Sequence, residues 1–276
     1  MKINFIKVNP VENMTLFVLD QIPRKDHIRV SNKIMHYSNL HAEQVGFIEV
    51  SKNDNSLIRL QMMGGEFCGN ATRSLAAFMV HNNYPQIKKS GDKFMVPLEV
   101  SGVNFIINCK VKELSKENLY DSTIEMPLPL SIKKFYLDFE DNSISVRRVN
   151  LPGIAHFIMD KTKINDKEKF YNLIKDKMSK ENYDAFGIMY YDYKENFMEP
   201  LVYVKSTDSL YWERSCASGC CALGATLSFA IKDSIEKSIN QPGGNLKVNV
   251  EYKNEKINSI YLSGEVEIVS EGIAYV

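Results

Sequence analysis

Short runs that alternate apolar and polar residues fill the first part of the chain, and turn-forming residues such as Asn9-Pro10 separate them. A period of two is typical of β-strands with one buried face. Strands are predicted over residues 2–8, 15–19, 45–50 and 57–63, with a turn over 52–56, and a hairpin over 94–100 and 103–111. Over residues 71–83, alanines, a leucine and aromatic residues recur at helical spacing, and Pro85 marks the end, so a helix is predicted there.

The second half of the chain repeats this order of elements. Strands are predicted over residues 145–150, 155–159, 187–192 and 201–204, helices over 167–177 and from about 220 to 236, and closing strands over 245–252, 256–262 and 264–269. Between the halves, Met126-Pro127-Leu128-Pro129 interrupts any regular element. We therefore expect an N-terminal half over residues 1–126, a C-terminal half over 127–264, and a closing strand over 265–276 whose return to the N-terminal half is left open.

The composition is that of an ordinary globular protein, since 44% of the 276 residues are hydrophobic and 25% are charged. Lysine plus arginine and aspartate plus glutamate balance at 34 each, so the charge favours neither nucleic acid nor an anionic membrane as a partner. No run approaches the roughly 20 apolar residues of a membrane span, and the N-terminus lacks an apolar signal core. A cytoplasmic protein is expected.

Five cysteines carry most of the candidate chemistry: Cys68, Cys109, Cys216, Cys220 and Cys221. Their odd number and the length of the chain argue against a disulfide framework. The last three have no nearby histidine, so no zinc site is expected, and the chain has neither a glycine-rich phosphate loop nor a recognisable pyridoxal-phosphate lysine. Cys109 lies in an alternating run and Cys220 and Cys221 lie in the predicted helix, so we interpret these three as packing residues.

Cys68 and Cys216 each stand at a turn before a predicted helix, in the segments EFCGNATRSLAA and ERSCASGCCALGA. The N–H groups of a helix N-terminus stabilise a thiolate, which lowers the thiol pKa, and they also bind carboxylates. Inversion of a carbon centre needs one group that removes the Cα proton and another that protonates the opposite face. Two such cysteines suit that reaction, with N–H donors stabilising the enolate-like transition state. Because a single cysteine is more often a buried small residue, catalysis and packing both stay open on the residues alone.

At these two turns the chain resembles the diaminopimelate epimerase family, whose cysteines stand in C-G-N-G-x-R and A-C-G-[TS]-G-A motifs. The matching runs are residues 68–73 and 215–220, and similarity extends to residues 13–15, 43–49, 156–157 and 264–275. The family's N-A-D-G-S-E segment, whose asparagine holds the distal end of the substrate, has no counterpart before Cys68. A site without that asparagine would leave a distal polar group unpaired, so a different substrate side chain is expected.

The histidine racemase branch of the family is more similar. It shares the motifs NP-x-x-NMT, E-Q-V-G-F-I-E, E-F-C-G-N-A-T, P-L-[IV]-Y, W-E-x-S-C-x-S-G and Q-P-G-G with this chain. The resemblance implies an α/β (α+β) fold of two pseudo-symmetric domains, each a β-sheet wrapped around a central helix, with the active site in the cleft between them. It also implies a racemase that interconverts L- and D-histidine without a cofactor or a metal.

The resemblance further assigns roles to particular residues. Cys68 and Cys216 are expected to exchange the roles of acid and base between the two reaction directions. The substrate-binding residues that it implies are Asn13, Gln44, Gly69, Asn70, Ala217, Ser218, Gly219 and Glu213. A small-molecule amino acid is the expected partner, and a homodimer is left open.

Other functions fit parts of the pattern. A diaminopimelate epimerase or a racemase of another amino acid would share the cysteine pair. A non-catalytic amino-acid binding protein of the same fold would bind its ligand without exchanging the Cα proton. A phenazine-biosynthesis-like isomerase of related fold is disfavoured, because those enzymes lack the cysteine pair.

Overall fold

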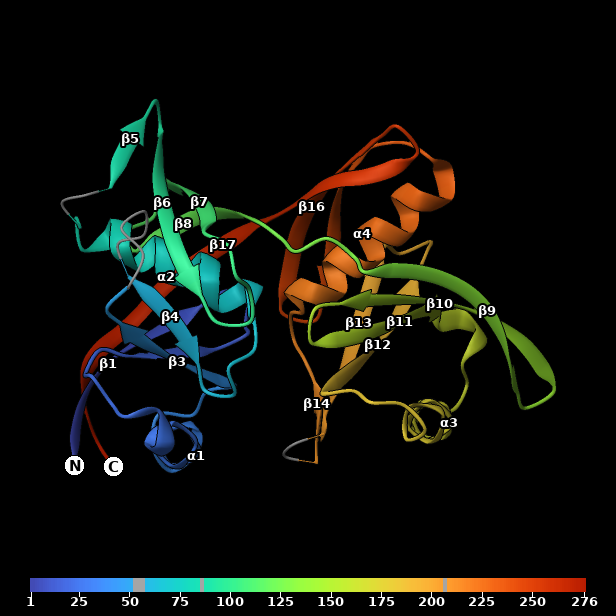
Figure 1. Cartoon of the computed structure of the whole chain (residues 1–276), viewed down its shortest axis with the longest axis horizontal. Coiled ribbons are helices and arrows are strands. Elements are labelled where there is room, and N and C mark those ends of the chain that lie inside the picture. The colour runs from blue at the N-terminus through green and yellow to red at the C-terminus, as the bar shows by residue number, and fades with distance from the viewer. Residues whose placement is uncertain (52–57, 85–86, 206–207) are drawn as a thin grey trace. The chain divides into compact units, whose positions relative to one another are not determined.

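The structure is a computed structural model that describes residues 1–51, 58–84, 87–205 and 208–276. Strands dominate it and helices are few, so the fold is mixed α+β as expected (Figure 1). The chain divides into two compact units, Met1–Met126 with Tyr261–Val276, and Pro127–Ile260. Each unit contains one largely buried helix. No helix in the described ranges is long and apolar enough to cross a membrane.

The first unit joins the two ends of the chain in one continuous hydrogen-bonded sheet. Its strands are β1 (Lys2–Asn9), β2 (Thr15–Val18), β3 (Gln44–Glu49), β4 (Arg59–Met62), β5 (Lys88–Ser90), β6 (Lys93–Val100), β7 (Ile107–Glu113), β8 (Leu119–Glu125) and most of β17 (Lys256–Tyr275). Strand β1 pairs antiparallel with both β2 and β17, and β2 pairs in parallel with β3. The short turn η1 (Arg24–Asp26) leads into α1 (His27–Met35), which lies near β3.

Helix α2 (Gly69–His81) lies at the centre of this unit, and every residue from Gly69 to Val80 is buried. It packs against β6, β7 and β8 (Figure 1). A helix that is buried all round needs apolar or internally paired side chains, and α2 has one fully buried charge, Arg73. The Arg73 guanidinium donates to the backbone oxygens of Gly264 and Glu265 in β17, at 2.9 and 2.7 Å. These two hydrogen bonds connect α2 to β17, the last strand of the chain.

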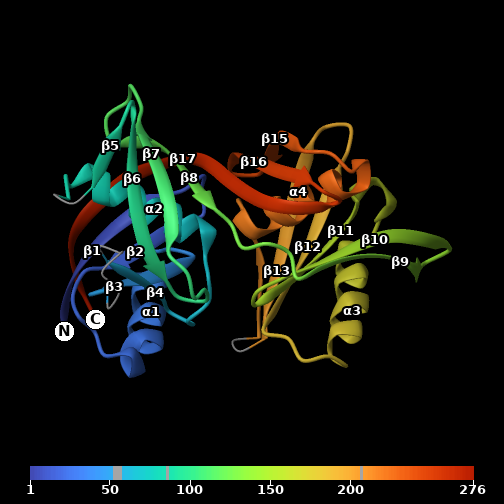
Figure 2. The ribbon, with the colours of Figure 1, turned by 45° about the horizontal axis from the view of Figure 1, so that its top comes forward.

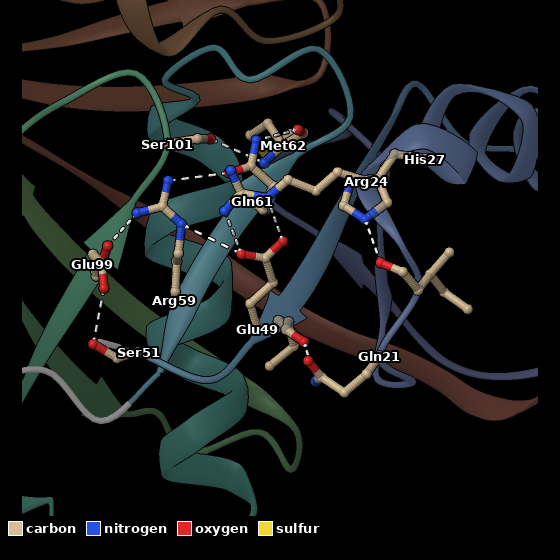
Figure 3. A network of polar contacts seen from close by, with 12 residues as sticks. Gln21, Arg24, His27, Glu49, Ser51, Arg59, Gln61, Met62, Glu99 and Ser101 are labelled. Atoms are coloured by element: carbon tan, nitrogen blue, oxygen red, sulfur yellow. Dashed lines mark hydrogen bonds and ion pairs between the residues drawn. The ribbon is translucent and has the colours of Figure 1, made fainter. Parts of the chain in front are cut away.

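A network of ion pairs joins three strands of the first unit to the turn before α1 (Figure 3). Arg59 of β4 lies between two carboxylates, pairing with Glu49 of β3 and with Glu99 of β6. Glu49 also accepts two hydrogen bonds from the Arg24 guanidinium, at 2.9 and 2.7 Å. The Arg24 hydrogen bond holds the pKa of the Glu49 carboxyl below its usual range. The network therefore links β3, β4 and β6 through their side chains.

In the part of the chain that the structure describes, the second unit has its own strands and two α-helices. Its strands are β9 (Ser131–Phe139), β10 (Asn142–Leu151), β11 (Ile154–Asp160), β12 (Ala185–Asp192), β13 (Phe197–Val204), β14 (Ser209–Trp212), β15 (Ile235–Gln241) and β16 (Gly244–Lys253), and its helices are η2 (Lys161–Lys163), α3 (Lys167–Met178) and α4 (Ala217–Ile231). Strands β11 and β12 run parallel, and α3 connects them.

Alternation along β12 sends its side chains to two helices on opposite sides of the strands (Figure 2). Phe186, Ile188 and Tyr190 join the aromatic core that includes α3. Met189, between them, lies against Gly219 in the first turn of α4. Helix α4 also packs on β10, β11, β15 and β16, which makes it the buried helix of this unit.

Most predicted elements are confirmed, with ends shifted by a few residues, but several are wrong or missing. The helix predicted from about 220 to 236 begins instead at Ala217 and ends at Ile231, because Lys232 adopts a left-handed conformation (φ 55°). Residues 235–236 belong to β15, the strand predicted from 103 starts only at Ile107, and the last two predicted strands are one continuous strand, β17. The sequence pattern did not predict α1, β5, β8, β9, β14 or β15. The predicted turn over 52–56, Leu57 and Pro85 lie outside the described residues.

Candidate active site

Cys68 is the residue immediately before α2, and its sulfur caps the helix. Its backbone is extended (φ −125°, ψ 112°), and Sγ accepts the Ala71 N–H at 3.4 Å. The first turn is closed by the Thr72 N–H and hydroxyl, which both donate to the Cys68 carbonyl oxygen. The side chain is partly exposed. The predicted helix-cap position of this cysteine is therefore observed.

Gln44 contacts the Cys68 sulfur from β3, and its amide is held in one orientation. The thiol donates to Gln44 Oε1 at 2.9 Å, while Gln44 Nε2 donates to Thr15 Oγ1 at 2.9 Å and to Asn13 Oδ1. Thr15 donates its own hydroxyl hydrogen to a carbonyl oxygen, that of Asn13, so it can only accept from Gln44. The amide oxygen of Gln44 must therefore face Cys68.

A second chain of hydrogen bonds fixes the orientation of the Asn70 and Asn13 side-chain amides. Arg73 Nε, which can only donate, faces Asn70 Oδ1 at 3.1 Å. Asn70 Nδ2 then donates to Asn13 Oδ1 at 3.1 Å, and Asn13 Nδ2 donates to the Glu43 carboxylate at 2.7 Å. A cation at one end and a carboxylate at the other fix the direction of both amides.

Cys216 has the corresponding position before α4. Its backbone is extended (φ −116°, ψ 108°), its sulfur accepts the Gly219 N–H at 3.3 Å, and only 4% of the residue is exposed. A Cβ on Gly219 would come within 2.3 Å of Met189 Sδ and 3.1 Å of Cys216 Sγ. Glycine is therefore the residue that lets this turn pass so close to the sulfur.

Glu213 opposes ionisation of the buried Cys216 thiol. Burial raises the thiol pKa well above its usual range, and the charge of the Glu213 carboxylate and its hydrogen bond with the thiol raise it further. Ser218 and the Gly219 N–H lower it by smaller amounts. The N–H group at the helix N-terminus lowers the thiol pKa as expected, but desolvation and a neighbouring negative charge outweigh it, so the expected net lowering is wrong for Cys216.

His156 of β11 reaches the same site through Ser218. Its Nε2 lies 2.9 Å from Ser218 Oγ, which in turn lies 3.6 Å from Cys216 Sγ. The ring is fully buried against Gly187, where a Cβ would approach Nδ1 to 2.4 Å, and burial lowers its pKa to about 3. Nδ1 has no hydrogen-bond partner among the described residues, which favours the tautomer with the hydrogen on Nε2. Ser218 then accepts from His156 and can donate to the sulfur.

The structure gathers the predicted site residues into two hydrogen-bonded groups, one in each unit. Asn13, Gln44, Cys68 and Asn70 form the first, with Gly69 as the first residue of α2. Glu213, Cys216, Ser218 and Gly219 form the second, with Ala217 as the first residue of α4.

Four residues in these groups were not predicted as part of the site. Thr15, Glu43 and Arg73 belong to motifs that carried the family resemblance, and His156 lies in the strand that resembles the family's N-P-H segment. That resemblance was the available signal for them. Among the described residues, no three His, Cys, Asp or Glu side chains gather as ligands of a metal ion would.

Comparison with known sequences matches nearly the whole chain. Residues 2–275 match the family described as "Histidine racemase CntK N-terminal domain". The chain is 35% identical over 277 residues to a histidine racemase of Fusobacterium nucleatum, covering 99% of this chain and 97% of the relative. It is 26% identical over 278 residues to the histidine racemase of Staphylococcus aureus, covering 99% and 98% of the two chains. The resemblance to this branch is therefore confirmed.

Solved structures share the fold at low sequence identity. A hydroxyproline epimerase from Agrobacterium vitis, solved with bound trans-4-OH-L-proline, has a TM-score of 0.73 and 10% identity, covering 99% of this chain and 92% of that one. A predicted epimerase from Pseudomonas aeruginosa has a TM-score of 0.67 and 8% identity, covering 98% of each chain. Both matches confirm an epimerase-like α+β fold, while the pseudo-symmetry of the two halves stays a prediction.

Proposed function

Because the chain belongs to the histidine racemase family, and is thus an isomerase of the amino-acid racemase class, we propose that it interconverts L- and D-histidine without a cofactor. Cys68 and Cys216 are the proposed acid–base pair, one acting on each face of the substrate Cα. The observation that carries the proposal is their matched position, each sulfur capping the N-terminus of a buried helix. A thiol in that position is next to N–H groups that stabilise negative charge.

The proposed reaction needs one thiolate and one thiol. The thiolate takes the proton from Cα, a carbanion with enolate character forms, and the other thiol donates a proton to the opposite face. After turnover the two sulfurs have exchanged protonation states, which suits the reverse reaction. The high pKa of Cys216 favours the thiol there in the unliganded protein, so we propose that it donates first.

The first turns of α2 and α4 are the proposed carboxylate sites. A helix N-terminus binds anions through its backbone N–H groups, and hydrogen bonds to the substrate carboxylate also stabilise the enolate-like charge. The residues that we propose for this role are Gly69, Asn70, Ala217, Ser218 and Gly219. Asn13 and Gln44 support Cys68, and Glu213 supports Cys216, as their hydrogen bonds indicate.

The cytoplasm is the compartment that we propose, because the mechanism depends on two reduced thiols. The choice of histidine as the substrate rests on the family.

A panel of L-amino acids incubated with the protein in D₂O tests the substrate. We expect the D-isomer and Cα deuterium with histidine, and neither with the other amino acids. If diaminopimelate or another amino acid were the only substrate, the proposal that histidine is the substrate would be wrong. Binding of histidine without any Cα exchange would refute racemase activity in favour of an amino-acid binding protein.

A further inference from the structure

The Gln-Pro-Gly-Gly segment at the turn between β15 and β16 lies against the residues that precede α4. Gln241, at the end of β15, is 3% exposed. Two hydrogen bonds join this turn to Arg214, which lies two residues before Cys216. The Gly243 N–H donates to the Arg214 carbonyl oxygen at 2.8 Å, and Arg214 Nη2 donates to the Pro242 carbonyl oxygen at 3.0 Å. The turn and the segment that leads to Cys216 therefore bind each other at both side chain and backbone.

Gln241 makes the most specific of these contacts, because it binds the backbone of Cys216 itself. The Cys216 N–H donates to Gln241 Oε1 at 2.8 Å, and Gln241 Nε2 donates to Cys220 Sγ at 3.2 Å. A backbone N–H can only donate, so the amide oxygen must face Cys216 and the amide nitrogen must face Cys220. One side chain thus spans the first turn of α4, from the cap residue to the residue four positions later.

We infer that Gln241 is a positioning residue for racemisation: by holding the Cys216 N–H, it fixes the direction in which the Cys216 sulfur points. The sulfur accepts the Gly219 N–H at 3.3 Å only while residue 216 keeps its extended backbone. Rotation of that backbone would move Sγ away from the helix N-terminus and from Ser218. The hydrogen bonds of Gln241 go to the Cys216 N–H and to Cys220 Sγ and not to Cys216 Sγ, so its effect on the reaction passes through the Cys216 backbone.

The expected effect of Gln241 on kcat rests on the proposed function, racemisation through Cys216. Misplacement of a reacting group by about 1 Å can cost roughly a hundredfold in rate. We therefore expect Gln241→Met, which keeps the size of the side chain and removes the acceptor, to lower kcat about 10- to 100-fold with less than a threefold change in KM. Gln241→Glu keeps an oxygen acceptor for the N–H, so it should retain more of the wild-type kcat at its own optimum pH.

Amide hydrogen exchange at Cys216 gives a readout that does not depend on turnover. The wild-type N–H is bound to a buried acceptor, so Gln241→Met should speed its exchange at least tenfold, while Gln241→Glu should protect it. Ser228→Ala is the matched control: Ser228 lies in the last turn of α4 and donates to the Asp233 carbonyl oxygen at 2.6 Å. Its loss removes a partly buried hydrogen bond at the far end of the same helix and should leave kcat and Cys216 exchange unchanged.

Wild-type kcat or wild-type Cys216 exchange in folded Gln241→Met protein would overturn the inference, as would an equal loss of kcat in Ser228→Ala. A wild-type protein that racemises no amino acid would instead refute the proposed function. In that case, the exchange rates alone still decide whether Gln241 holds the Cys216 N–H.

Discussion

Cys68 and Cys216 have the same local structure in two different helices. Each precedes its helix in an extended conformation, and each sulfur accepts the N–H three residues later, at 3.4 and 3.3 Å. Their other partners differ, because the Cys68 thiol donates to the neutral amide of Gln44 while Cys216 faces the carboxylate of Glu213. Both sulfurs thus have a backbone N–H group that stabilises a thiolate, while at Cys216 a neighbouring carboxylate opposes ionisation of the thiol.

Replacing either cysteine by serine should abolish racemisation. A hydroxyl is far less acidic than a thiol and cannot act as the base, so we expect Cys68→Ser and Cys216→Ser each to lower kcat/KM by at least about 10³-fold. Chiral chromatography of the products measures this. Cys109→Ala is the matched control, because Cys109 is a fully buried core residue of β7, and it should lose stability only. Turnover within tenfold of wild type in either serine variant would contradict the proposed mechanism.

Glu213→Gln should make Cys216 easier to ionise. The Glu213 carboxylate raises the Cys216 pKa by its charge and its hydrogen bond, so a neutral amide there should lower that pKa. The alkylation rate of Cys216 by iodoacetamide, followed by mass spectrometry across pH, should rise at every pH below the wild-type pKa. Glu199→Gln, at a carboxylate paired with Lys161 and Lys167 in the same unit, serves as the control and should change nothing. Identical alkylation profiles for Glu213→Gln and wild type would remove Glu213 from this role.

Acid should destabilise the fold partly through His156. Its folded pKa is lowered to about 3, while an unfolded histidine titrates near ~6.5. Below pH ~6.5 the unfolded chain binds a proton that the folded chain does not, so the free energy of unfolding should fall by up to about 1.4 kcal/mol per pH unit. Urea unfolding of wild type and His156→Gln between pH 7 and 5 measures the difference.

Comparison of those two proteins isolates His156, because His27, whose pKa is also lowered, is present in both. We expect the wild type to lose about 2 kcal/mol more than the variant across this range. Parallel pH profiles would mean that His156 titrates in the folded protein as it does in the unfolded chain, which would contradict its lowered pKa.

The sequence predicted the two cysteine caps because the residues that specify each cap lie next to one another in the chain. A cysteine followed by small residues and then an apolar helix is readable within a dozen positions, and both α2 and α4 begin at or near the predicted place. The end of α4 was misread because Lys232 terminates the helix in a left-handed conformation without a glycine or proline to mark it. Ile235 and Glu236, the first two residues of β15, were then included in the helix.

The chemical environment of the two sulfurs could not be predicted from neighbouring residues in the sequence. Burial of Cys216 depends on strands more than 20 residues away, and Gln241, which binds its N–H, stands 25 positions later in the chain. The sequence therefore predicted the helix effect on the thiol pKa but not the desolvation that reverses it. Likewise, the contact between Gln44 and Cys68 joins residues 24 positions apart in the chain, which no local pattern encodes.

Isotope labelling in D₂O tests most directly whether two different groups act on the two faces of Cα. With L-histidine as substrate and the reaction stopped early, the D-histidine formed should carry one deuterium at Cα, while the remaining L-histidine should carry almost none. A single base that serves both faces would put deuterium into both isomers at the same rate. Equal labelling of the two isomers would contradict the account, and so would the absence of D-histidine.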